Sequence, residues 1–197
     1  MKKISLVAAL MVLLCGASLS AKDFDWSQSW CNYGGGIKEG NFLVSVDAGL
    51  DFSDFVYAGN SGFWFMPPVM VDVQYAKKIG KLPFTFGGFA GVSGHGYRYY
   101  DYYDYVNGVS VYATRYWWNI FFGAEAAYHP MLPAEKLDVY IITRIGANIP
   151  VTNGYTYFGD YILFGEAIGL NWFFSEKVAL NAEVGYPFEK IGVTFKF

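Results

Sequence analysis

The most constraining feature of this chain is the strict alternation of residue type over residues 191–197. Four apolar side chains fall on one face of an extended strand: Ile191, Val193, Phe195 and Phe197. The residues between them are small or polar: Gly192, Thr194 and Lys196. A period of two residues is typical of a β-strand with one apolar face. The end of the chain is therefore predicted to be a strand.

The same alternation recurs upstream and predicts seven further strands, which span about residues 41–52, 65–77, 83–93, 116–128, 137–148, 161–173 and 177–186. Segments of about ten residues are long enough for tilted strands to cross a bilayer. The face opposite the polar residues carries Val, Ile, Leu, Phe and Trp, and this face would be polar in a soluble sandwich. In lipid an open edge would leave unpaired backbone groups at several kcal/mol each. We therefore predict an all-β fold, an eight-stranded antiparallel up-and-down transmembrane β-barrel.

The start of the chain has the layout of a secretory signal peptide. Lys2 and Lys3 precede an apolar run from Ile4 to Cys15, which is too short for a membrane-spanning helix, and small residues follow up to Ala21. We therefore expect residues 1–21 to be a cleaved signal peptide, 22–40 an N-terminal lead or plug segment, and 41–197 the barrel. Residues 22–40 could instead extend the first strand.

Composition excludes several functional classes. Loss of Lys2 and Lys3 would leave 12 basic residues against 17 acidic ones, a net charge near −5, which disfavours nucleic acid as a partner. Two widely separated histidines and a single mature cysteine, Cys31, form no metal-ligand pattern. Neither His95 nor His129 belongs to the His-x-Ser element of lipid A deacylase barrels. We expect no cofactor, no metal and no enzymatic activity.

With these features the chain resembles the small eight-stranded outer-membrane barrels, the family that includes OmpX, the OmpA N-terminal domain and OmpW. The resemblance rests on the signal peptide, the strand count, and Ala182-Glu183-Val184-Gly185-Tyr186 ahead of the terminal strand. It implies a location in the cell outer membrane, contact with outer-membrane lipid, and a monomer. It also implies that the barrel-assembly machinery recognises the terminal strand as an assembly signal, with Phe195 and Phe197 as its aromatic residues.

The inward strand faces carry charged residues, which we expect to form a charge network in the lumen: Asp47, Asp51, Asp72, Glu125, Asp138, Arg144, Glu183 and Lys196. Buried charges need partners, and small barrels fill their interior with side chains. This pattern favours a packed interior with Arg144 and Lys196 as hubs. The excess of acidic groups leaves a narrow cation-preferring or water-filled path as the alternative.

Connections of alternating length predict short periplasmic turns and longer external loops. The longest loop, 94–115, holds six tyrosines within residues 97–105: Tyr97, Tyr99, Tyr100, Tyr102, Tyr103 and Tyr105. Tyrosine gives large contact area at low entropic cost, so this loop is a candidate surface for a ligand. It could instead be an extended hairpin with cross-strand tyrosine pairs. We predict a structural or surface-interaction role, with an OmpW-like channel for small hydrophobic or cationic solutes as the alternative.

Two details of side-chain direction stay open at this point. Glu166 falls on the lipid side of its strand, so either a β-bulge turns it inward or it lies near an interface. Aromatic residues near strand ends are predicted to form girdles at the lipid boundary: Tyr128, Tyr140, Trp172, Phe173 and Phe174.

Overall fold

The computed structural model describes residues 26–50, 63–132, 134–153, 161–186 and 189–197. One short helix, α2 (Trp26–Ser29), precedes eight strands. The strands are β1 (Phe42–Leu50), β2 (Trp64–Ile79), β3 (Leu82–Asp104), β4 (Val109–Tyr128), β5 (Leu137–Thr152), β6 (Ile162–Phe173), β7 (Val178–Tyr186) and β8 (Glu189–Lys196). The predicted signal peptide and Asp51 lie outside the described residues.

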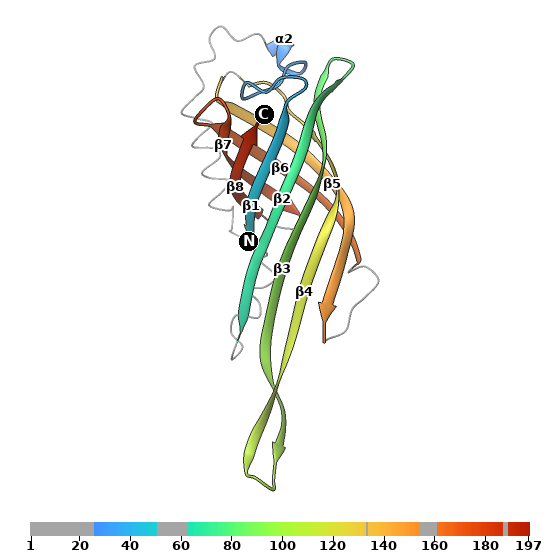
Figure 1. Cartoon of the computed structure of the whole chain (residues 1–197), viewed down its shortest axis with the longest axis vertical. Helices are drawn as coiled ribbons and strands as arrows, with labels where there is room; N and C mark the ends of the chain where they lie inside the picture. Colours follow the sequence, from blue (N-terminus) through green and yellow to red (C-terminus); the bar gives the residue numbers. More distant parts are fainter. Residues whose placement is uncertain (1–25, 51–62, 133, 154–160, 187–188) are drawn as a thin grey trace.

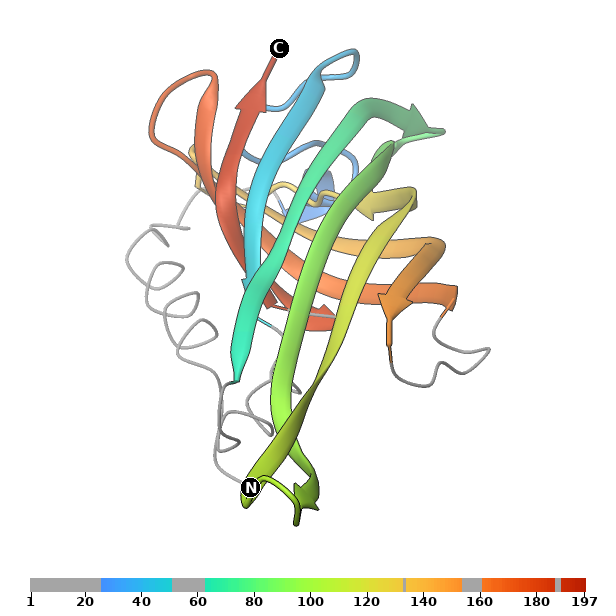
Figure 2. The ribbon, with the colours of Figure 1, turned by 60° about the horizontal axis from the view of Figure 1, so that its bottom comes forward.

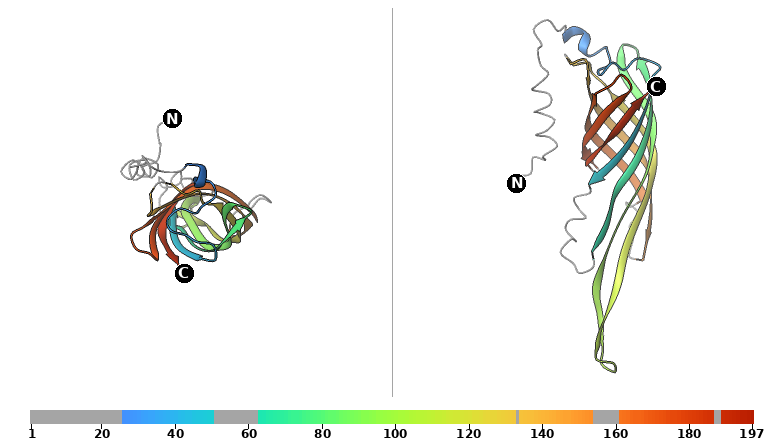
Figure 3. Two further views of the ribbon diagram at one scale, coloured as in Figure 1. Left: turned by 90° about the horizontal axis from the view of Figure 1, so that it is seen from above. Right: turned by 60° about the vertical axis from the view of Figure 1, so that its left-hand side comes forward.

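The strands form a closed antiparallel barrel in which each strand pairs with its neighbour in sequence and β8 pairs with β1 (Figures 1 and 3). The closing pair places Ser45 opposite Thr194, and their hydroxyl groups are hydrogen-bonded at 2.8 Å. Closure pairs the edges that an open sheet would leave free, which removes the cost of exposing them to lipid. The predicted fold class is confirmed.

The two faces of the sheet differ as the alternation predicts. The outward face carries large apolar side chains that are about half exposed, among them Ile145 at 61% and Ile168 at 53%. On the inward face Ile142 is 0% and Met70 1% exposed. Glu166 also points outward and is exposed, and β6 keeps an unbroken register with both neighbouring strands. No bulge therefore turns it inward. Glu166 pairs with Tyr186, the last residue of β7.

Strands β3 and β4 are 23 and 20 residues long, far longer than predicted. Most of the segment predicted as a loop at 94–115 is a continuation of these strands, and the resulting hairpin projects well beyond the other strands (Figures 1 and 2). Pairing continues to Asp104 opposite Val109, with one irregularity between Tyr100 and Tyr102. We call residues 97–115 the tyrosine hairpin.

At the opposite end, residues 26–41 cross the mouth of the barrel, and we call them the cap segment. The Tyr33 hydroxyl donates to the carbonyl of Phe84 on β3 at 2.7 Å, and the Gly35 amide donates to the carbonyl of Leu137 on β5. Lys196 on β8 donates to the carbonyls of Gly35 and Gly36. These bonds reach strands on different sides of the barrel, so the segment closes its mouth.

Two expected girdle residues point inward instead. Tyr140 and Phe173 are each 3% exposed, whereas Trp172 and Phe174 are 41% and 52% exposed. Phe173 packs in a cluster under the cap segment with Tyr33, Ile37 and Leu43. Within the described residues, no helix is long and apolar enough to span a membrane.

Candidate functional site

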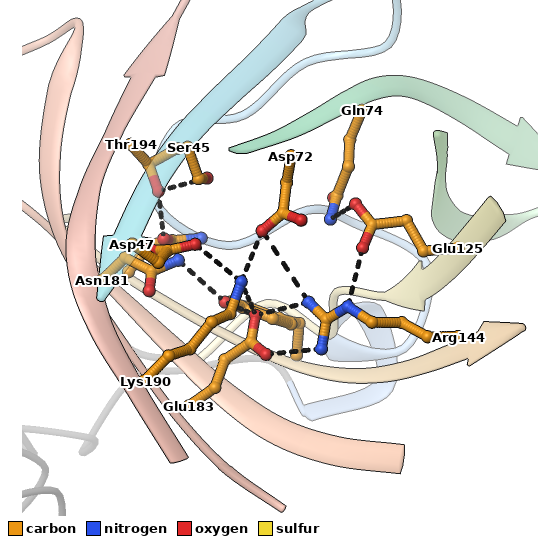
Figure 4. A network of polar contacts seen from close by, with 12 residues as sticks. Ser45, Asp47, Asp72, Gln74, Glu125, Arg144, Asn181, Glu183, Lys190 and Thr194 are labelled. Atoms are coloured by element: carbon orange, nitrogen blue, oxygen red, sulfur yellow. Dashed lines mark hydrogen bonds and ion pairs between the residues drawn. The ribbon is translucent and has the colours of Figure 1, made fainter. Parts of the chain in front are cut away.

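The middle of the barrel is filled by a network of buried charges centred on Arg144 (Figure 4). The Arg144 guanidinium donates two hydrogen bonds to Glu183, at 2.7 and 3.0 Å, and a third to Glu125 at 2.9 Å. A two-bond contact between guanidinium and carboxylate is the strongest common ion-pair geometry. Arg144 is 4% exposed, so these contacts are shielded from water.

Lys190 is the second cation of the network and was not predicted from the sequence. Its ammonium group bonds to Asp47 at 2.7 Å, to Asp72, and to Glu183 at 3.2 Å. The terminal strand was predicted to begin at 191, whereas β8 begins at Glu189. Extending the same alternation back by one residue places Lys190 on the inward face with Gly192 and Thr194, so the pattern itself carried the signal.

A chain of neutral and charged groups continues the network toward the cap segment. Gln74 donates to Glu125 at 2.7 Å and accepts from Thr85 at 2.6 Å. Thr85 also contacts His129 Nε2 at 2.9 Å, and His129 Nδ1 lies 3.0 Å from Asp138. Because the Thr85 hydroxyl donates to Gln74, its oxygen is left to accept from His129 Nε2.

The chain then returns to the barrel seam. Asn171 donates to Asp138 at 2.8 Å, and Thr194 donates to Asn171 at 3.0 Å. Since the Thr194 hydroxyl is used in this way, Ser45 is the donor in the Ser45–Thr194 pair. The hydrogen bonds thus run continuously from Arg144 to the pairing of β1 with β8.

The hydrogen-bonded row of hydroxyl, imidazole and carboxylate resembles a hydrolase triad in its order: Thr85, His129 and Asp138. Unlike a catalytic triad, the row is not accessible to a substrate. All three are at most 1% exposed, and the Thr85 proton is directed at Gln74, away from His129. The His129 ring also packs against the rings of Tyr140 and Tyr33, at centroid distances of 5.1 and 6.2 Å. A substrate has no route to the hydroxyl, and the row acts as packing and support.

Six of the eight residues predicted for the charge network lie in this interior: Asp47, Asp72, Glu125, Asp138, Arg144 and Glu183. Lys196, expected as a hub, instead binds the cap segment, with its ammonium group 4.4 Å from the centre of the Phe173 ring. Lys196 lies near the end of β8, where the mouth of the barrel opens, so its long side chain reaches carbonyls at the rim.

Acidic groups outnumber cations in the central network. Asp47, Asp72, Glu125 and Glu183 surround Arg144 and Lys190, and within the described residues Asp47 Oδ1 and Asp72 Oδ1 have no hydrogen-bond partner. No group of three or more His, Cys, Asp or Glu side chains in the described part of the chain could hold a metal ion. The two cations already occupy the space between the carboxylates.

Apolar layers fill the lumen on both sides of the charges. Toward the tyrosine hairpin, Met70, Phe89, Phe121 and Leu163 form a buried cluster, and the Arg144 guanidinium lies over the Phe89 ring. Toward the cap segment, Tyr140 fills the space that a side chain at Gly169 would need. The Tyr140 hydroxyl in turn donates to Glu183 at 2.8 Å.

The tyrosine hairpin is an aromatic surface outside this packed interior. On the face that continues the lumen side, the Trp117 ring stacks with His95 and Tyr97 at centroid distances of 5.2 and 5.9 Å, and Arg115 lies over Tyr99. The opposite face carries Tyr100 and Tyr112, which are 55% and 57% exposed and meet edge to face. The hairpin is therefore held by its own aromatic pairs.

All six predicted tyrosines belong to this element. Tyr97, Tyr99, Tyr100, Tyr102 and Tyr103 lie in β3, and Tyr105 lies in the turn. The Asp104 carboxylate accepts hydrogen bonds from the amides of Val106 and Asn107 and from the Asn107 side chain, and these bonds lower the pKa of Asp104. Gly108 closes the turn with a φ of 67°.

The barrel resembles known structures in its fold, and no protein-family model and no curated protein matches the sequence. A chain described as a de novo designed transmembrane β-barrel matches 82% of this chain and 98% of its own length, with a TM-score of 0.51 and 15% identity. The outer membrane protein Ail of Yersinia pestis, determined in a phospholipid bilayer nanodisc, matches 81% of this chain and 100% of its own length, with a TM-score of 0.36 and 13% identity. The first likeness supports the assignment of the fold as a transmembrane β-barrel.

Proposed function

We propose that this protein is an outer-membrane barrel with a closed lumen, and that the barrel holds the tyrosine hairpin rigidly above the cell surface to contact a partner. The observation that carries this proposal is the continuity of β3 and β4. The same two strands that line the packed interior extend 23 and 20 residues and end in the exposed aromatic surface. A binding element fixed in this way loses little conformational entropy when it binds.

The orientation follows from the two ends of the barrel. Short connections such as Gly80-Lys81 and the cap segment lie at one end, and the tyrosine hairpin lies at the other. Outer-membrane barrels place short turns in the periplasm and long segments outside. The exposed apolar band between the two ends would face outer-membrane lipid, and the assembly machinery would insert the chain as a monomer.

Truncation of the tyrosine hairpin tests the proposal. Arg98 and Thr114 are register partners, so an Asn-Gly turn can join them in place of residues 99–113. We expect a folded barrel whose expressing cells lose adherence to other bacterial cells or to eukaryotic cell layers. A matched variant keeps the full-length hairpin and replaces four of its tyrosines by Thr: Tyr100, Tyr102, Tyr103 and Tyr112. It separates a role of the aromatic side chains from a role of the length of the hairpin alone. Adherence unchanged by the truncation would contradict the proposal.

A channel for small hydrophobic or cationic solutes is the second candidate. The excess of carboxylates in the interior and the apolar cluster of Met70, Phe89, Phe121 and Leu163 favour it. Against it, these side chains fill the lumen and are at most 8% exposed. Conductance across a planar bilayer separates the two functions. A closed lumen gives no stepwise increases in conductance, whereas reproducible cation-selective conductance steps would favour the channel.

A further inference from the structure

A pocket at the cap end of the barrel is separate from both the interior network and the tyrosine hairpin. It has a volume of about 740 Å³ and is formed by the cap segment, the segment before β5, the turn between β6 and β7, and the end of β8. We call it the lysine pocket, because its walls include Lys38, Lys136, Lys177 and Lys196.

The pocket carries a net positive charge. Among the described residues that line it, the acidic side chains are Glu135 and Glu176, against four lysines. Lys38, Lys136 and Lys177 are exposed, and none of them has a carboxylate partner in the ion pairs of the described residues. Lys196 is already bound to the cap carbonyls. Three ammonium groups are thus available to an anion.

The rest of the wall is aromatic. Phe173 forms the buried side of the pocket, and Phe174 and Phe197 line it while remaining 52% and 68% exposed. Trp172, which directly precedes Phe173, faces outward and is 41% exposed. A ligand in this pocket would therefore meet cations with one part and large apolar rings with the other.

The pocket also lies at a defined depth. It is at the end where the exposed apolar band stops and the short turns begin, which in a membrane is the level of lipid headgroups. Basic pockets at this level bind anionic headgroups, because the phosphate meets the cations while the chains stay in hydrocarbon. We propose that the lysine pocket binds the phosphate headgroup of an anionic phospholipid from the periplasmic leaflet. This requires the barrel to span a membrane but does not depend on the role of the hairpin.

Native mass spectrometry of the folded protein in detergent tests this binding. Phosphatidylglycerol is titrated against phosphatidylcholine, whose choline group screens its phosphate. We expect phosphatidylglycerol to bind at least tenfold more tightly, and the Lys136→Gln/Lys177→Gln double variant to lose at least tenfold of that affinity. The control, Lys81→Gln, removes an exposed charge at the same end outside the pocket and should change affinity less than twofold.

Three outcomes would overturn the proposal: equal binding of the two lipids, equal losses in the double variant and in the Lys81→Gln control, or full displacement of lipid by millimolar inorganic phosphate that also binds alone. The last outcome would make this a site for free phosphate. Heat-modifiable gel migration establishes that each variant is folded. Hydrogen exchange in residues 174–177, slowed by phosphatidylglycerol in the wild type only, gives a second readout. The hairpin truncation should retain lipid binding, so the two proposals fail separately.

Discussion

At the scale of single residues, the interior shows how a small barrel keeps charges away from water. Arg144 and Lys190 each contact more than one carboxylate, and Gln74, Tyr140 and Asn181 supply further hydrogen bonds around them. A buried charge without a partner is unfavourable by several kcal/mol. Each cation therefore has several partners, and loss of one cation would affect all of them.

Replacement of Lys190 by Met is expected to lower the free energy of unfolding by about 3–5 kcal/mol, since it leaves Asp47 buried without a cation and Asp72 with only the 3.9 Å contact to Arg144. The measurement is a urea titration of the protein folded in lipid vesicles, followed by heat-modifiable gel migration. Lys81→Met, at an exposed turn, is the control and should change stability by less than about 0.5 kcal/mol. Equal midpoints for the two variants would contradict a central role for Lys190.

At the scale of elements, the tyrosine hairpin depends on its turn. The Asn107 side chain and the amides of Asn107 and Val106 bind the Asp104 carboxylate and lower its pKa. The stabilisation of the turn by these bonds is fully present above the unfolded-state pKa of Asp, about 4. It is lost as the pH falls through the lower pKa that Asp104 has in the folded protein.

We expect amide hydrogen exchange at Val106 and Asn107, corrected for the intrinsic pH dependence, to accelerate as pH falls through the Asp104 titration. Asp104→Asn should abolish this dependence, because its side chain does not titrate. NMR of the protein in micelles provides the measurement. The same profile in the wild type and the variant would show that Asp104 does not hold the turn.

The cap segment is a second element whose attachment can be tested. Tyr33 is 7% exposed, packs with Ile37 and Phe173, and donates to the Phe84 carbonyl; burial raises its pKa to about 12, so it remains a donor. We expect Tyr33→Ala to raise trypsin cleavage after Lys38 at least tenfold while the barrel stays folded. Trp30→Ala, which removes a side chain that is 59% exposed, is the control. Unchanged cleavage of the Tyr33 variant would show that other contacts hold the cap.

At the scale of the whole molecule, the outward apolar face implies that hydrocarbon surrounds the barrel. Ile145 lies near the middle of β5, opposite Ala124 and Phe164, and is 61% exposed. Ile145→Lys should lower the free energy of unfolding in lipid vesicles by about 2–4 kcal/mol, the cost of Lys at the midplane.

Ile79→Lys provides the comparison for this test. Ile79 is the last residue of β2, beside a short turn, and is 55% exposed. At such a rim position the cost of Lys falls to about 0–1 kcal/mol, so Ile79→Lys should change stability by no more than that amount. If Ile145→Lys had an effect as small as that of the control variant, water and not hydrocarbon would be the solvent of the outward face.

Much of the fold could be predicted from the sequence because the strand period is a local property. The inward positions of Asp72, Glu125 and Arg144 follow from counting by twos along each strand. The same counting fails near strand ends. Lys190 was missed by one residue. The tyrosine run at 97–105 was placed in a loop with an extended hairpin as the alternative, and the structure shows the hairpin.

The sequence by itself determined the strands, their faces and the solvent that each face requires, since these depend only on residue type and the two-residue period. Only the tertiary structure decided which buried charges meet, how far β3 and β4 extend, and that residues 26–41 cap the mouth. These features depend on contacts between segments far apart in the chain. Lys190 lies 143 residues from Asp47, and their ion pair exists because closure of the barrel brings β8 beside β1.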